Sequence, residues 1–180
     1  TRERYLTGAD FDTEGFQIVG ETVWIGDEFG PFLISVDMQG RVTGVYNTMV
    51  DGKPVRSPDH PSVSMPAVPG AVSFEARRSR GYEGMAASKD GRVLYPLLEG
   101  PLWDGKGWEM KEGREVLRIL EFDIAARAFT LRSWKYVLEA NGNNIGDFNM
   151  IDADTALIIE RDNGEGDPAD ACTGAPQPSC

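Results

Sequence analysis

The sequence predicts an all-β protein made of antiparallel, four-stranded sheet units like the blades of a β-propeller. Three observations support this prediction: a weak internal repeat, short apolar runs of strand length, and turn residues between those runs. Gly supplies 21 and Pro 11 of the 180 residues, which is enough to separate many short strands. Repeated units of four strands with turns between them are typical of a propeller.

The repeat begins with an acidic residue in each of three segments. These residues are Glu14, Glu83 and Asp147, and they lie 69 and 64 positions apart. Each is followed by a short apolar stretch, a turn and an apolar strand, which predicts an antiparallel hairpin in every copy. In the second copy Asp90 and Gly91 supply the turn, because Asp-Gly readily adopts the backbone conformation that a tight hairpin requires.

A third and a fourth strand are expected after the hairpin in the first two copies. The sequence places them at 32–37 and 41–46 in the first copy, and at 117–123 and 128–137 in the second. Residues 112–126 also fit a helix, but the alignment of the two copies favours a strand there.

The predicted elements divide the chain into blade-like units and loop-rich segments. The units cover about residues 10–50, 80–140 and 145–165, a Pro-rich insert covers 51–70, a loop with two Trp covers 101–114, and a loop tail covers 163–180. A closed ring needs at least about four units. We therefore expect an incomplete segment, about three blades, of a larger propeller; an open sandwich is the alternative.

Charge and hydropathy narrow the possible partners. The chain carries 18 basic and 29 acidic residues, a net charge of −11. Nucleic acid is therefore a poor partner, since phosphate backbones require a basic surface, whereas cations or basic ligands suit an acidic protein. No apolar run reaches the roughly 18 residues of a membrane-spanning helix, and the first residues lack the apolar core of a signal peptide.

Two cysteines, Cys172 and Cys180, lie eight positions apart near the end of the sequence. A disulfide between them would close a small loop and would imply an oxidising compartment. The alternative is two free thiols in a frayed tail. Because there are no other cysteines, a zinc site of the CxxC type is excluded.

Acidic residues at the starts and ends of predicted strands are the main candidates for chemistry. In a propeller the first strand of each blade lines the central channel, so matched acids there would converge. Crowded carboxylates either hold protons or hold a cation, and oxygen ligands favour Ca²⁺. The predicted ligands are Glu14, Asp27, Glu28, Glu83, Asp147, Glu160 and Asp162. The alternative is that each acid caps a turn.

Two arginines lie close to these acids in the sequence and are predicted to bind phosphate. Arg80 precedes Glu83, and Arg161 stands between two predicted ligands. The guanidinium group binds phosphate in a bidentate way, although ion pairing with neighbouring acids is the alternative role. His60 is the only histidine, and we expect it in a surface loop rather than in a catalytic triad.

Several sequence blocks resemble a known family. The blocks DEFGP, RGYEG and ERDNG, together with LTGADFDTEGF and IGDFNMID, are similar to the bacterial family called esterase-like activity of phytase, or phytase-like. The similarity runs over nearly the whole chain apart from the Pro-rich insert. It implies that residues 1–180 form part of a β-propeller-like domain of an exported protein, with a phosphoesterase or esterase role. It supplies no catalytic residues.

We therefore expect a secreted or periplasmic, calcium-dependent hydrolase of phosphate esters, acting at the channel mouth of a propeller. Its expected partners are a small-molecule phosphate ester or other ester, and the remaining part of the parent propeller. Arg80 and Arg161 would hold the phosphate, while the acids hold Ca²⁺. The alternatives are a secreted, non-catalytic binding module with structural calcium, or an inactive fragment of the parent enzyme.

Overall fold

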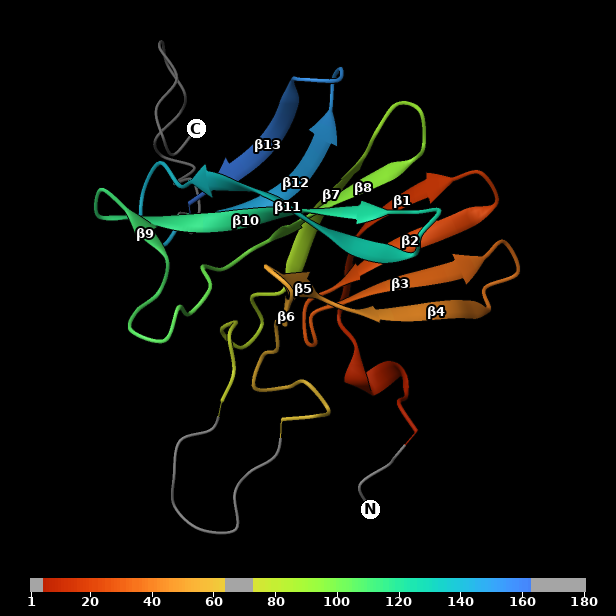
Figure 1. Cartoon of the computed structure of the whole chain (residues 1–180), viewed down its shortest axis with the longest axis horizontal. Coiled ribbons are helices and arrows are strands. Elements are labelled where there is room, and N and C mark those ends of the chain that lie inside the picture. The colour runs from red at the N-terminus through yellow and green to blue at the C-terminus, as the bar shows by residue number, and fades with distance from the viewer. Residues whose placement is uncertain (1–4, 64–72, 163–180) are drawn as a thin grey trace, which may run out of the picture.

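The computed structural model describes residues 5–63 and 73–162, which form an all-β, antiparallel structure. The first sheet has four strands in chain order (Figure 1). Its strands are β1 (Thr13–Val19), β2 (Thr22–Asp27), β3 (Phe32–Asp37) and β4 (Val42–Asn47). The prediction of antiparallel four-stranded units is thus confirmed.

The second sheet has the order β11-β10-β8-β7, with a short strand β9 paired to β10, and a separate hairpin follows it. The strands of the second sheet are β7 (Tyr82–Ala87), β8 (Val93–Leu98), β9 (Met110–Lys111), β10 (Arg114–Asp123) and β11 (Ala128–Val137). The third hairpin consists of β12 (Asn144–Met150) and β13 (Ala156–Arg161). Residues 114–123 form a strand, so the helical alternative for this region is wrong.

Smaller elements lie around the sheets. A short ladder pairs β5 (Met49–Val50) with β6 (Lys53–Pro54), at the beginning of the Pro-rich insert. The helical element η1 (Gly8–Asp10) has only three residues, so the described residues contain no helix able to cross a bilayer. The predicted tail and both cysteines lie outside the described residues.

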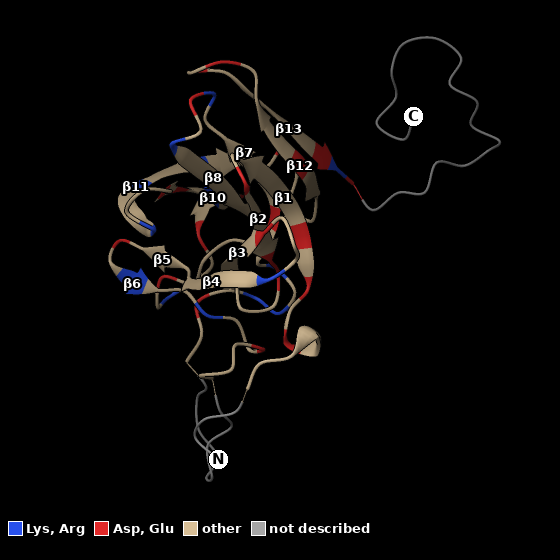
Figure 2. Ribbon diagram, turned by 90° about the vertical axis from the view of Figure 1, so that its right-hand side faces the viewer, with Lys and Arg blue, Asp and Glu red and all other residues tan. Residues whose placement is uncertain are grey.

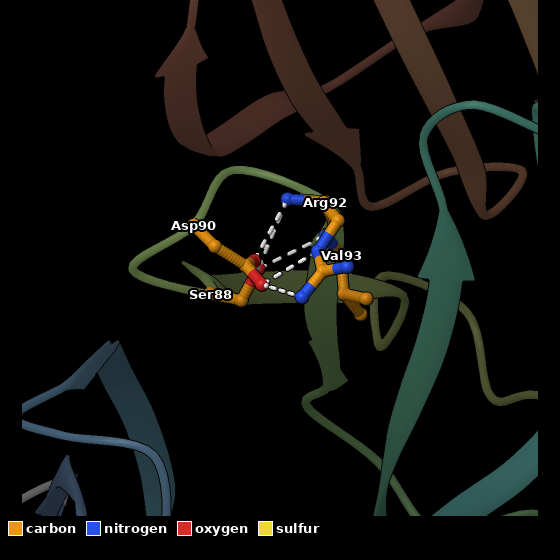
Figure 3. Close-up of polar contacts among 4 residues, drawn as sticks. All are labelled: Ser88, Asp90, Arg92 and Val93. Carbon is orange, nitrogen blue, oxygen red and sulfur yellow. Dashed lines mark hydrogen bonds and ion pairs between the residues drawn. The ribbon is translucent and has the colours of Figure 1, made fainter.

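The turn between β7 and β8 shows how a sequence signal fixes a hairpin (Figure 3). Gly91 adopts a positive φ of 66°, which side chains with a Cβ disfavour. The Ser88 hydroxyl donates to Asp90 Oδ1 at 2.7 Å and accepts from the backbone N–H of Val93 at 3.0 Å. Arg92 Nε donates to Asp90 Oδ2 at 2.6 Å. The predicted Asp-Gly turn is therefore present.

Two apolar layers join the sheet units face to face. Between the first and second sheets, Trp24 and Leu33 pack with Met85, Leu94 and Phe122. A second layer joins the second sheet to the third hairpin, with these buried members: Ala86, Leu97, Leu117, Leu138, Ile145 and Phe148. The units are therefore stacked sheet on sheet, as blades are.

The innermost strands β1, β7 and β12 lie beside one another, because small residues allow a close approach. A Cβ atom added to Gly15 would lie 2.5 Å from the carbonyl oxygen of Glu83. A Cβ added to Gly84 would lie 2.9 Å from the Cβ of Phe148. Each glycine thus sets the spacing between its own innermost strand and the next.

Candidate functional site

A β-bulge in each innermost strand positions the first candidate residues. In β7 the pairing runs from Tyr82 opposite Leu98 to Gly84 opposite Leu97, so Glu83 is the extra residue. In β1 the register also shifts, between Thr13 and Phe16, where Glu14 lies. A bulge removes its extra residue from the ladder and redirects the side chain. Glu14 and Glu83 therefore occupy equivalent places in the first and second sheets.

Acids also follow the second strand of each of these sheets. Glu28 comes directly after β2 and Glu99 directly after β8. Each follows the residue that pairs with the innermost strand just before the bulge of that strand. The backbone N–H of Glu28 donates to the carbonyl of Asp12 at 2.8 Å. A Cβ added to Gly81 would lie 2.3 Å from the carbonyl oxygen of Glu28. Glycine at position 81 therefore lets the second sheet approach Glu28.

Five carboxylates meet where the first two sheets adjoin, and we call them the carboxylate cluster. They form two groups of three that share Glu28, and within each group the carboxylate oxygens lie within 4.8 Å of one another. The members are Asp12, Glu14, Glu28, Glu83 and Glu99. Figure 2 shows acidic segments in red on β1 and close to β2, with β7 alongside. Glu28 and Glu99, which are 71 positions apart in sequence, are thus brought together.

Burial, followed by the nearby carboxylates, raises the pKa values of three of these groups, Glu14, Glu28 and Glu83. Burial, followed by the hydrogen bond and charge of Glu99, raises the pKa of Glu28 to about 8. Burial and the charges of Glu99 and Glu14 raise the pKa of Glu83 to about 7. Burial and the charge of Asp12 also raise the pKa of Glu14. Without a cation, the cluster therefore holds protons at neutral pH.

Two arginines partly balance this negative charge. Arg80 NH1 lies 3.0 Å from Glu99 Oε1, and the Glu99 side chain is only 5% exposed. Arg80 also donates to the side-chain oxygen of Asn144. The charges of Arg161 and Arg80 oppose the upward shift of the Glu83 pKa. Both predicted phosphate-binding arginines thus lie near the cluster, and Arg80 is engaged in an ion pair.

A groove of about 460 Å³ opens beside the cluster on the innermost strands. Glu14, Glu83 and Asp147 all line it, together with Gln17 and Asn149. The three acids that begin the predicted repeats therefore do converge on one surface.

Asp147 does not occupy the same strand position as the other two acids. In β12 the bulge falls between Ile145 and Asp147, so Gly146 is the residue equivalent to Glu83, and the predicted alignment is wrong by one residue. The oxygens of Asp147 accept from the N–H of Phe148 at 2.7 Å and from Asn149 Nδ2 at 2.9 Å. Asp147 therefore lines the groove and also stabilises its own strand.

Two other predicted ligands are engaged in local hydrogen bonds. Asp27 is fully buried, and its oxygens accept from the N–H groups of Asp12 at 2.8 Å and Gly30 at 2.7 Å. Glu160 accepts from the Tyr136 hydroxyl at 2.6 Å and from Asn143 Nδ2 at 2.8 Å. Although burial raises the pKa of Glu160, these hydrogen bonds hold it below its ordinary value. Neither residue belongs to the carboxylate groups described above, and Asp162 follows β13 at the edge of the described residues.

Sequence analysis missed two members of the cluster, Asp12 and Glu99. A signal for Glu99 is present, because Glu99-Gly100-Pro101 follows β8 as Glu28-Phe29-Gly30-Pro31 follows β2. Asp12 carries no such signal. It reaches the cluster because its backbone is tied to Asp27 and Glu28.

The expectation for His60 is corrected by the structure. His60 lies in a loop but is only 7% exposed, with its ring packed at 4.8 Å from that of Phe32. Its Nδ1 accepts from the N–H of Ser62 at 3.0 Å, and its Nε2 lies 3.2 Å from Asn47 Oδ1. Burial and the charge of Arg56 lower its pKa. His60 is thus a buried, neutral residue of the fold.

Comparison with known proteins places this geometry in a family. The model of the phytase-like family, described as "esterase-like activity of phytase", matches residues 2–175. The chain belongs to the phytase-like family. It is also 29% identical, over 124 residues, to an uncharacterized secreted protein of Arthroderma benhamiae. No solved structure matches the chain.

The fungal relative is much longer than the region that it shares with this phytase-like chain. The similarity covers 63% of the chain but only 24% of the relative. The relative is a secreted protein by name, whereas the bacterial origin implied by the sequence resemblance stays a prediction.

Proposed function

We propose that this phytase-like chain binds Ca²⁺ at the carboxylate cluster and takes part in the hydrolysis of phosphate esters, as part of a secreted protein. The observation that carries the proposal is the pair of carboxylate groups that share Glu28, with oxygens within 4.8 Å of one another. The family description and the secreted relative support the class of activity and the export.

The residues present fit a hard divalent cation. Ca²⁺ takes six to eight oxygen ligands, with carboxylates among the preferred donors, and the cluster offers five carboxylates without a competing sulfur or imidazole. The pKa values of Glu28 and Glu83 are raised first by burial and then by neighbouring carboxylates, and both causes disfavour the ionised groups when no cation is bound. A bound cation would supply charge neutralisation and would polarise a phosphoryl oxygen.

The groove beside the cluster would receive the phosphate ester. Its lining includes Glu14, Glu83 and Asp147, so an anionic ester is repelled unless positive charge lies next to it. Gln17 contributes a fixed amide, since its Nε2 donates to the carbonyl of Met85 at 2.7 Å. Asn149 provides a second amide next to it, 3.3 Å from Gln17 Nε2. These amides would orient the ester, and Arg161 would contribute positive charge.

Calcium titration of the protein tests both parts of the proposal. After treatment with a chelator, Ca²⁺ is added while the thermal midpoint, the binding heat and the hydrolysis of p-nitrophenyl phosphate are measured. We expect saturable binding, a higher midpoint and activity that requires Ca²⁺. Glu28→Gln should abolish all three, whereas Glu160→Gln, outside the cluster, should retain them. Unchanged activity in excess chelator would contradict the hydrolase proposal.

A second candidate function is a non-catalytic binding module in which Ca²⁺ is structural. The observation that favours it is the engagement of Arg80, which pairs with the buried Glu99 rather than facing the groove alone. In that case Ca²⁺ raises the thermal midpoint of the protein, but neither p-nitrophenyl phosphate nor p-nitrophenyl acetate is hydrolysed. Hydrolysis of the acetate alone would indicate an esterase.

A further inference from the structure

Another groove, of about 270 Å³, lies between the β5–β6 ladder and the segment 102–109. None of its lining residues belongs to the carboxylate cluster. Part of its lining is apolar and firmly packed, because Val55 and Leu102 belong to a buried core cluster. Trp103 also lines it and is 40% exposed. We call this site the Trp103 groove.

A small hairpin within residues 102–109 fixes the backbone of Trp103. Trp103 pairs with Trp108 in an antiparallel bridge. The hairpin closes beyond this pair, since the N–H of Asp104 donates to the carbonyl of Gly107 at 3.0 Å. Directly opposed residues of antiparallel strands hold each other in place, so Trp103 is not a freely moving surface residue.

The ring of Trp103 is also held. It packs edge-on against the ring of Trp108, with centroids 5.3 Å apart and an interplanar angle of 71°. The guanidinium of Arg77 lies 4.5 Å from the centre of the Trp108 ring and pairs with Glu115 at 2.8 Å. Such contacts restrict the orientation of both rings. The exposed part of Trp103 is therefore a preorganised aromatic platform.

Paired charged groups lie in the same groove. Glu109 and Arg118, each 15% exposed, share two hydrogen bonds at 2.7 and 2.9 Å. Lys135 Nζ lies 2.6 Å from Glu109 Oε1, and Glu75 pairs with Arg56 at 3.0 Å. These carboxylates are already neutralised by protein cations, yet their oxygens accept more than one hydrogen bond each.

The exposed charges of the groove do not select an ion either. Lys53 stands with Asp51 and Asp104 in the exposed part of the lining. Asp104 Oδ1 accepts from the N–H groups of Lys106 at 2.8 Å and Gly107 at 2.9 Å, so this carboxylate stabilises its own turn. An anion would meet two carboxylates and one ammonium, which disfavours it.

A neutral sugar combines the properties that this groove requires. The C–H groups of a sugar ring are weakly positive and pack on the negative face of an aromatic ring. Its hydroxyl groups both donate and accept, as neighbouring paired carboxylates and guanidinium groups require. The volume is slightly below the roughly 300–1,000 Å³ of sites for drug-sized ligands, so the groove suits one or two sugar rings.

We propose that the Trp103 groove binds a neutral sugar unit. The sugar ring stacks on Trp103, and its hydroxyl groups bond to the pair of Glu109 and Arg118. This binding requires neither Ca²⁺ nor the hydrolysis of an ester, so it stands apart from the function proposed for the carboxylate cluster.

NMR titration of the tryptophan indole N–H groups tests the proposal. The probes are maltotriose, cellotriose, xylotriose and chitotriose, which are neutral and differ in linkage and ring substituents. We expect at least one probe to shift the Trp103 signal saturably, with a dissociation constant on the order of 1 mM, because only one or two rings make contact. If none of these probes shifts the signal at about 20 mM, well above that constant, the proposal is overturned.

Trp134 is the internal control, because it is 39% exposed and also packs edge-on against an aromatic ring, that of Tyr95 at 5.7 Å. The groove that it lines contains Ile119 and Ile158 but neither Glu109 nor Arg118. Its indole signal should stay unchanged. Equal shifts at both tryptophans would mean unspecific stacking and would contradict the proposal. So would a Trp103 shift with tetramethylammonium but with none of the sugars, since that result indicates a cation site.

Substitution followed by calorimetry provides a measurement that does not need the indole signal. Trp103→Ala should weaken binding at least roughly tenfold, as expected for a central aromatic contact. Trp103→Phe keeps the packing and a smaller aromatic face, and it should weaken binding roughly threefold even if the alanine variant does not fold. Trp134→Ala should bind like the wild type. Unchanged affinity in the folded Trp103 variants would overturn the proposal.

Discussion

The first two sheet units and the third hairpin use the same backbone arrangement but place opposite chemistry on it. At the bulge, the first and second sheets carry Glu14 and Glu83, whereas the third hairpin carries Gly146. At the position after the second strand, the sheets carry Glu28 and Glu99. In the hairpin the equivalent position holds Arg161. It follows Glu160, the residue of β13 that pairs with β12 just before the bulge.

This difference teaches that the candidate site is a feature of one junction and not of the whole array. The backbone presents two side chains per unit at the edge of the innermost strands, and their identity decides the local charge. At the junction of the first two sheets all four are carboxylates, and Asp12 adds a fifth. At the third hairpin Arg161 replaces a carboxylate, and its positive charge opposes the rise of the Glu83 pKa.

The largest predicted effect concerns the spacing that brings the first two units together. Gly15→Ala places a Cβ 2.5 Å from a backbone oxygen of β7, so the sheets must separate. We expect a loss of about 2–3 kcal/mol in the free energy of unfolding, as for overpacked cores. Urea unfolding, with linear extrapolation, measures it.

Gly146→Ala is the matched control for this substitution. Its added Cβ meets nothing nearer than Ile159 Cγ2 at 3.6 Å, which is an ordinary contact. We expect a change of at most about 0.5 kcal/mol, or a slight gain from the stiffer unfolded chain. If both variants unfold at the same urea concentration, the close junction is not specific to the first two units.

The next effect concerns the pH dependence of stability in the presence of a chelator. The pKa of Glu28 is raised to about 8 by burial and by Glu99. The stability from Glu28 is therefore fully present below its ordinary pKa of 4.5 and is lost as the pH rises through about 8. In Glu28→Gln this loss should disappear, so the variant should gain a few degrees in thermal midpoint over the wild type between pH 5 and 8.5.

Glu160 provides the opposite case within the same molecule. Its pKa is lowered by the Tyr136 and Asn143 hydrogen bonds, which outweigh its burial, so its contribution is present above its ordinary pKa and is lost as the pH falls through the lowered value. Glu160→Gln should therefore weaken the protein most at neutral pH and least in acid. If the thermal midpoints of the Glu28 and Glu160 variants changed with pH in the same way, ionisation of Glu28 would not be disfavoured in the cluster.

Sequence analysis predicted the strands well because apolar periodicity and turn residues determine them locally. The predicted strands 32–37 and 128–137 coincide with β3 and β11. The convergence of Glu14, Glu83 and Asp147 on one groove also followed from the repeat. Whether they bind a metal stays a prediction.

The remaining features depend on register and on long-range contacts, which the sequence shows only weakly. Asp147 was aligned by its charge, but the bulge in β12 sets the register and places Gly146 at that position. Asp12 joins the cluster through backbone contacts with a distant strand end. His60 is buried because Phe32 and Asn47 of the first sheet cover it, and a Pro-rich segment gives no hint of this.

The smallest predicted effect tests whether the third hairpin tunes the cluster by charge alone. The positive charge of Arg161 opposes the rise of the Glu83 pKa, so Arg161→Gln should raise that pKa further, since one cation near the carboxylate is lost. Carboxyl carbon NMR of Glu83, in chelator, measures the midpoint directly.

Arg132→Gln is the control, because Arg132 pairs with Glu121 at 3.3 Å on the second sheet and is absent from the groups that shift Glu83. Its Glu83 midpoint should match the wild type. A midpoint that stays the same in Arg161→Gln would mean that Arg161 has no electrostatic effect on the cluster. The third hairpin would then differ from the first two sheets only by having Gly146 where they have a carboxylate.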